Sequence, residues 1–114
     1  MPADVQAARI AHNTATTTAK TVALTDRVLC VSVRNRDDAD SLYVAVRASS
    51  DAAVALAAVV ATPATVGGDD CFVIPPGGFA LVHSGGIPEY VALSIIASAG
   101  TAAYSVTGTM FDQF

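Results

Sequence analysis

The feature that most constrains this chain is an alternation of apolar and small residues through 90–111, YVALSIIASAGTAAYSVTGTMF. The alternating positions are Val91, Leu93, Ile95 and Ala97 before a Ser-Ala-Gly-Thr break, and Tyr104, Val106, Gly108 and Met110 after it. A period of two over such lengths is typical of strands with one buried face. Gly100 can adopt the positive φ that a tight turn needs. The sequence therefore predicts a closing hairpin whose apolar face the rest of the chain covers.

Short β-patterned segments precede this hairpin, separated by turn residues. The predicted strands are 16–25, 28–35, 42–48, 71–74 and 79–83, with breaks at 35–41, 75–78 and 84–88. In 79–83, the alternation places Phe79, Leu81 and His83 on one face. We predict an all-β fold, an antiparallel, jelly-roll-like β-sandwich of about seven to eight strands that spans 16–114.

Two segments lack a clear strand pattern. Residues 1–15 favour an N-terminal arm or a short helix that Pro2 opens. Residues 51–62 carry helix formers after a good N-cap residue, Asp51, whereas Val59 and Val60 favour a strand. We favour a short helix for 51–62 and keep a strand as the alternative.

The composition is too apolar for a small isolated domain. The chain has 114 residues, of which 53% are hydrophobic and 14% charged, whereas soluble domains are about 25% charged. One interpretation is that many of the apolar residues are alanines, which a surface tolerates. We favour the other interpretation, that part of the surface is buried in an assembly.

Several functional classes are disfavoured. A net charge of −4 without clustered Lys and Arg argues against a nucleic-acid partner. The N-terminus shows no signal-peptide pattern, and the apolar run 52–61 is shorter than the roughly 20 residues that span a bilayer, so we expect no membrane partner. Cys30 and Cys71 lie among apolar residues and read as free, buried thiols, with a disulfide as the alternative.

No motif indicates catalysis or a cofactor. His83 and Ser84 lack the Gly-x-Ser-x-Gly turn of a nucleophile elbow, and neighbours on a strand point to opposite faces. Asp37, Asp38 and Asp40, or the pair at 69–70, offer oxygen ligands for calcium but lack the EF-hand spacing. We predict that the protein is not an enzyme and that it binds no cofactor and no metal. The sequence does not decide whether the Asp-rich loops bind calcium.

Five residues are candidate contact residues because large apolar side chains at strand margins and chain ends can anchor an interface. They are Ile10, Tyr43, Tyr90, Phe111 and Phe114. The alternative is that these side chains cap the chain's own core.

Three segments of the chain resemble small β-sandwich structural proteins of tailed bacteriophages: NRDDADSLYVAV, FVIPPGGFALVHSGG and the closing YVALSIIASAGTAAYSVTGTMF. The resemblance covers 16–114 and rests on turn and core positions, so it carries over no functional residue. It implies a head decoration (cement) protein or a head–tail adaptor component without enzyme activity. Such proteins bind the capsid lattice, often as trimers.

We therefore expect a structural protein of the virion, assembled in the host cytoplasm. We expect it to form a homo-oligomer, specifically a trimer. It would bind the major capsid protein or other virion subunits and stabilise the head. The alternative functions are a tail- or fibre-associated module that binds a ligand or carbohydrate, and a head–tail adaptor. The absence of Trp counts against sugar stacking.

Overall fold

The computed structural model describes residues 6–111, with side-chain burial for 12–109. The elements are β1 (Gln6–Ala15), β2 (Lys20–Ala23), β3 (Val28–Asn35), β4 (Leu42–Ser49), α1 (Ala52–Ala61), β5 (Phe72–Ile74), β6 (Phe79–Ala97) and β7 (Ala102–Phe111). Every strand pair in this part of the chain is antiparallel. The predicted all-β sandwich and the short helix in 51–62 are confirmed.

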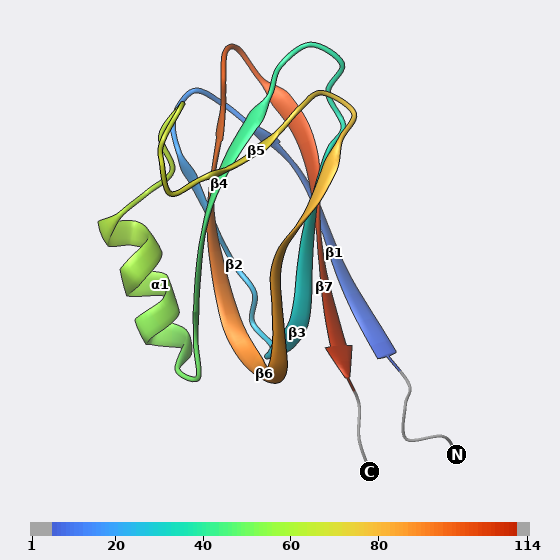
Figure 1. Ribbon diagram of the computed structural model, residues 1–114, viewed down its shortest axis with the longest axis vertical. Helices are drawn as coiled ribbons and strands as arrows, with labels where there is room; N and C mark the ends of the chain where they lie inside the picture. Colours follow the sequence, from blue (N-terminus) through green and yellow to red (C-terminus); the bar gives the residue numbers. More distant parts are fainter. Residues whose placement is uncertain (1–5, 112–114) are drawn as a thin grey trace.

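The strands form two sheets that β6 joins. Sheet A has the order β1-β7-β3-β6, and sheet B has the order β2-β6-β4-β5. Residues 79–89 of β6 pair with β3, whereas residues 90–97 pair with β2 and β4. Figure 1 shows β6 descending along one sheet, bending at the bottom of the view and ascending along the other. With the two halves of β6 counted as separate strands, the order is that of an eight-stranded jelly roll.

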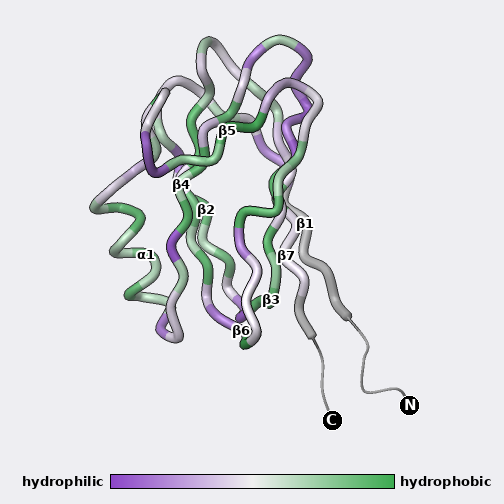
Figure 2. The backbone as a smooth tube through the Cα atoms, in the orientation of Figure 1, coloured by the Kyte–Doolittle hydropathy of each residue, from purple (hydrophilic) through white to green (hydrophobic). Residues whose placement is uncertain are grey.

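The core lies between the two sheets. Its largest fully buried side chains include Tyr104, Leu42, Ile74, Leu93 and Ile95. They come from strands of both sheets, and each strand contributes every second residue because its side chains alternate between faces. The strands of the sandwich are accordingly mostly green in Figure 2, and the loops carry most of the purple.

Helix α1 lies on the outer face of sheet B. The Asp51 carboxylate accepts a hydrogen bond from the Ala53 N–H (2.9 Å), as an N-cap does. The helix ends at Thr62, whose N–H donates to the Ala58 carbonyl oxygen. Ala55 and Val59, the two buried residues of α1, pack on Ala92 of β6.

The predicted closing hairpin is wrong in its pairing, although both of its strands exist. β7 pairs with β1 and β3 in sheet A, and residues 90–97 of β6 pair with β2 and β4 in sheet B. The turn at Gly100, whose φ is +57° as expected, therefore crosses from one sheet to the other. Two strands that each carry an apolar face can bury it as neighbours in one sheet or face to face in two sheets. Alternation alone does not distinguish these two arrangements.

The N-terminal prediction is also corrected. In place of an arm or short helix over 1–15, Gln6–Ala15 forms β1 along β7, and Ala15 is fully buried. The sandwich therefore begins before residue 16. The free edge of β7 supplies a backbone partner for small residues whose own pattern is weak.

The predicted break at 84–88 lies inside β6, a strand of 19 residues. The pairing of β3 with β6 shifts register between Val28 and Cys30 and again between Val31 and Ser32. Such irregularities bend a strand, and here they let β6 pass from sheet A to sheet B. They also separate His83 from Phe79 and Leu81, because His83 pairs with the buried Val31.

Candidate interaction surfaces

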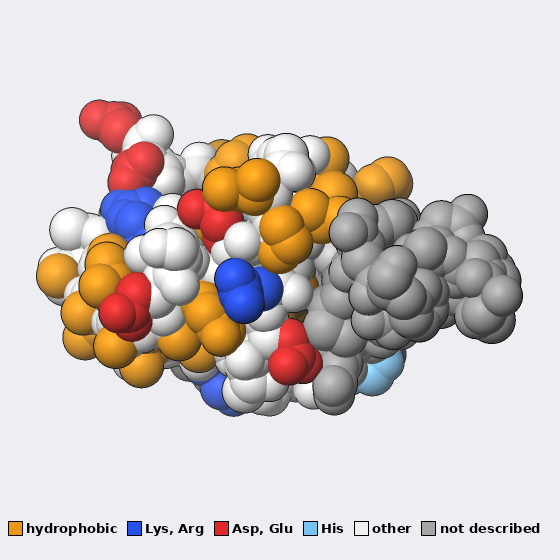
Figure 3. Space-filling model, turned by 90° about the horizontal axis from the view of Figure 1, so that it is seen from below, with side chains coloured by type: hydrophobic (Ala, Val, Ile, Leu, Met, Phe, Trp, Pro, Cys, Tyr) orange, Lys and Arg blue, Asp and Glu red, His pale blue; other side chains and the backbone are white. Residues whose placement is uncertain are grey.

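The exposed side of α1 is entirely apolar. Its sequence, AAVALAAVVA, has no polar side chain, and Val54, Leu56 and Val60 are 55%, 41% and 60% exposed. We call these three residues the helix patch. The helix is green in Figure 2, and in Figure 3 hydrophobic side chains gather on the side of the molecule where α1 lies. A helix that is hydrophobic all round is normally buried on every side, so this surface lacks a cover.

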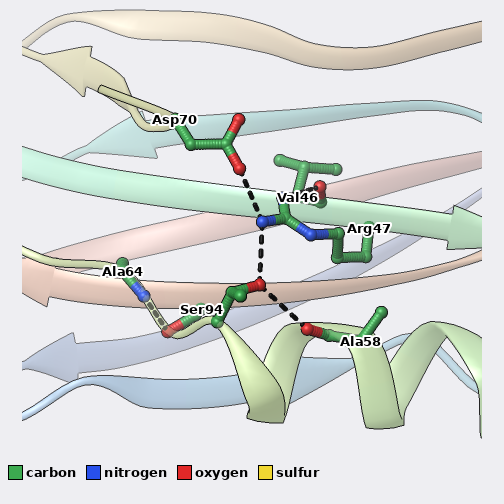
Figure 4. A network of polar contacts seen from close by, with 7 residues as sticks. Val46, Arg47, Ala58, Ala64, Asp70 and Ser94 are labelled. Carbon is green, nitrogen blue, oxygen red and sulfur yellow. Dashed lines mark hydrogen bonds and ion pairs between the residues drawn. The ribbon is translucent and has the colours of Figure 1, made fainter. Parts of the chain in front are cut away.

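A polar network fixes the position of α1 on sheet B (Figure 4). The guanidinium of Arg47, on β4, donates to the Asp70 carboxylate (2.6 Å) and to the Thr62 hydroxyl oxygen (2.9 Å). The Thr62 hydroxyl in turn donates to the Ala58 carbonyl oxygen in the last turn of the helix (3.0 Å). The Ala64 N–H donates to the buried Ser94 hydroxyl oxygen on β6 (2.9 Å). The helix patch is therefore presented by a fixed element.

A second group of exposed apolar side chains lies on the strands that end the two sheets, β5 and the first half of β6, which run on the near side of Figure 1. Phe72 and Val73 of β5 are 42% and 56% exposed, and Phe79 and Leu81 of β6 are 73% and 55% exposed. We call these four residues the edge patch. β5 is the last strand of sheet B, and the first half of β6 is the last strand of sheet A. The four residues therefore lie on the strands at the open side of the sandwich, and Phe79 and Leu81 are on the outer face of sheet A.

Of the predicted contact residues, two are engaged within their own chain. Tyr43, on β4, is half-buried and packs on Ala64 and Ile96 beneath the loop that follows α1. Tyr90 is half-buried with the Arg27 guanidinium 5.9 Å above its ring centre, a cation–π distance.

The other predicted contact residues are placed only in part. Ile10 and Phe111 lie on β1 and β7, paired with Thr107 and Gln6, and their side chains are outside the described set. Phe114 lies outside the described residues. Their role as contact residues stays a prediction.

Sequence reasoning missed both patches as specific sites. The signal for the helix patch is present in the sequence, because a segment predicted as helix and bearing no polar residue has no face to give to water. The signal for Phe79 and Leu81 is weaker. Alternation predicts that the two residues share a face of the strand. It does not predict that this face is exposed to solvent or that the strand lies at the edge of a sheet.

The residues weighed for catalysis do not assemble into a reactive group. His83 Nε2 lies 3.7 Å from a Glu89 carboxylate oxygen, while the Ser84 hydroxyl lies 3.8 Å from the Cys30 sulfur. His83 pairs with the buried Val31, so it faces away from Ser84. Both cysteines are free, as predicted. They are half-buried, whereas the sequence predicted buried thiols.

The Asp-rich loops serve local structure. The Asp37 carboxylate accepts hydrogen bonds from the N–H groups of Ala39 and Asp40 (3.0 and 2.7 Å), and Asp70 binds Arg47. Within residues 6–111, no three His, Cys, Asp or Glu side chains come together as a metal site would require. A pocket at the β2–β3 connection, lined in part by Leu24 and Val28, measures about 110 Å³, well below the roughly 300 Å³ of the smallest usual ligand pockets.

No helix in the described part of the chain combines the length and apolar character needed to cross a bilayer. No family model, curated protein or solved structure matches this chain. The two apolar patches are thus the features on which a function can be argued.

Proposed function

We propose that this protein is a structural subunit that self-associates and docks on the subunits of a larger particle, a virion of a tailed bacteriophage. In this role it binds the major capsid protein or a neighbouring virion subunit and stabilises the head. The observation that carries the proposal is the helix patch, an apolar helix surface fixed on the outside of the sandwich.

The physical basis is burial of apolar area. Fully burying a Val or Leu side chain is worth about 1.5–3 kcal/mol, and the three residues of the helix patch are about half exposed. Covering them would therefore contribute about 1 kcal/mol each before the entropic cost of association. The helix already fixes the backbone that carries these side chains, so a partner that covers them orders only their remaining rotamers.

Fold and sequence together favour the virion over other assemblies. Jelly rolls build viral capsid domains as well as lectins and cupins, and a fold alone does not determine a function. The turn and core segments that resemble phage structural proteins narrow this choice. The small pocket and the absence of Trp give the ligand- or carbohydrate-binding alternative less support.

Size-exclusion chromatography with light scattering tests the assembly part of the proposal. The variant Val54→Asp/Val60→Asp puts charge on the helix patch at exposed positions and should lower the mean mass of the assemblies. The control is Ala99→Asp, which puts a charge on the exposed turn between β6 and β7 and should leave the mass unchanged. Equal masses for wild type, variant and control would contradict the role of the helix patch.

The genes next to this one test the virion part. Neighbouring genes for a major capsid protein, a portal or a tail component would support it. A neighbourhood made only of metabolic genes would contradict it and leave self-association standing.

A further inference from the structure

The first half of β6 is an open edge of sheet A. Its residues 79–84 pair with β3 on one side, and no strand in the described chain pairs with them on the other side. Nor does a loop in residues 6–111 form backbone hydrogen bonds to them there. An edge of this kind presents a row of unpaired N–H and C=O groups that another strand can bind.

This edge lacks three features that usually keep edges apart, namely Lys, Pro and a very short length. It does carry a bulge, because its pairing with β3 shifts register between Leu81 and His83. The segment FALVHS has no Lys, Arg, Asp, Glu or Pro. By contrast, the edge strand β2 has four residues and starts at the exposed Lys20, and β5 has three residues and stops before Pro75. At the far edge of sheet A, β1 carries Arg9.

We propose that two copies of this chain pair through residues 79–84 of β6, antiparallel and about a two-fold axis, so that their A sheets become one continuous sheet. The inference rests on the proposed function, because it names the contact through which copies associate. A second copy is the partner that fits for two reasons. The second copy presents the same unpaired backbone N–H and C=O groups. Because the segment has no charged side chains, two copies of it can pair without placing like charges opposite each other.

The side chains fit the same arrangement. Phe79 and Leu81 point to the outer face of sheet A, where they are 73% and 55% exposed. Across a two-fold strand pair they come beside the same two residues of the second copy, and each pair shields the other from water. The contact uses the same surface on both copies, so its direct product is a dimer and not the trimer that the phage resemblance implies.

Amide hydrogen exchange of the full chain at low and high protein concentration, alongside sedimentation velocity, tests this contact. We expect amides within 79–84 to exchange at least tenfold more slowly when the dimer is populated. Leu81→Lys, which changes an exposed side chain, should raise the dimer dissociation constant at least tenfold and abolish this protection. Phe79→Lys serves as the second variant if Leu81→Lys does not fold.

Val60→Lys is the matched control, since Val60 is 60% exposed but lies on α1. It should lower higher-order assembly and leave the concentration-dependent protection of 79–84 intact. Association without protection of 79–84, or an undiminished dimer in Leu81→Lys, would overturn the edge contact and leave the proposed function standing. A chain that is monomeric at every concentration would overturn both self-pairing and the self-association in the proposed function.

Discussion

The side-chain amide of Asn35, on sheet A, donates a hydrogen bond to the backbone carbonyl oxygen of Ile74, on sheet B (3.0 Å). The same amide donates to the Asp40 carbonyl oxygen (2.8 Å), and its own carbonyl oxygen accepts from the Asp37 N–H (3.0 Å). Asn35 is fully buried. One side chain thus ties the two sheets and the β3–β4 connection together at one end of the sandwich.

Asn35→Ala should lower the free energy of unfolding by about 3 kcal/mol, because it leaves buried carbonyl oxygens without donors. Asn13→Ala is the control. Asn13 is exposed and its side chain accepts only from the adjacent Thr14 N–H among the hydrogen bonds described, so the change should stay within about 0.5 kcal/mol. Urea unfolding measures both, and equal losses would show that Asn35 does not hold the sheets together.

Tyr104→Phe should raise stability or leave it unchanged. The Tyr104 hydroxyl is buried without a hydrogen-bond partner in the described structure, and removing such a group recovers about 1 kcal/mol of desolvation cost. Thermal unfolding at neutral pH measures the change. A loss of more than about 1 kcal/mol would mean that the hydroxyl makes a bond that stabilises the fold.

Burial also raises the pKa of Tyr104 above its ordinary value of 10.0. Above pH 10.0 the unfolded chain loses this phenol proton while the folded chain retains it until the higher folded pKa is reached. The contribution of this phenol to stability is therefore fully present below pH 10.0 and is lost as the pH rises through the folded pKa. The advantage of Tyr104→Phe over wild type should grow between pH 9 and pH 11, roughly the range around a tyrosine pKa, and an advantage that shrinks would contradict the assignment.

Gly108→Ala should destabilise the sandwich by about 1 kcal/mol through overpacking. A Cβ at this position on β7 would lie 3.1 Å from the side chains of Leu24 and Val28. Gly86→Ala is the control, because a Cβ there meets no atom within 4 Å. Thermal unfolding should separate the two variants, and equal melting temperatures would argue against the close approach of β7 to the β2–β3 connection.

Arg47→Met should loosen α1 without unfolding the sandwich. The variant keeps the apolar stem and loses the hydrogen bonds to Thr62 and Asp70. We expect faster amide exchange in α1 and in 62–70, with a global loss of about 1 kcal/mol or less because the ion pair is partly exposed. Arg34→Met, at an exposed position on β3, should change neither.

The sequence was sufficient to predict most of the strands, but not β1, the continuity of β6 or how the strands pair. Alternation located β3 and β4 closely, and Asp51 marked the start of α1. Alternation shows which face of a strand is apolar, whereas the neighbour of that strand depends on the connections and on contacts far apart in the chain. The strands around Gly100 were therefore expected to pair with each other, although they lie in different sheets.

The candidate surfaces were predictable only in outline. The excess of apolar residues indicated an uncovered surface, but aromatic residues drew attention to Tyr43 and Tyr90, which their own chain partly buries. Phe79 is exposed because it lies on the uncovered outer face of sheet A, at the edge of that sheet. Its edge position follows from the sheet order, which the local pattern does not contain.

We propose that other molecules cover the apolar patches of this protein. Sedimentation equilibrium of the unmodified chain over a wide concentration range tests self-association most directly. We predict a mean mass that rises with concentration above the 11.5 kDa of one chain. A mass that stays at 11.5 kDa up to the highest concentration would contradict it.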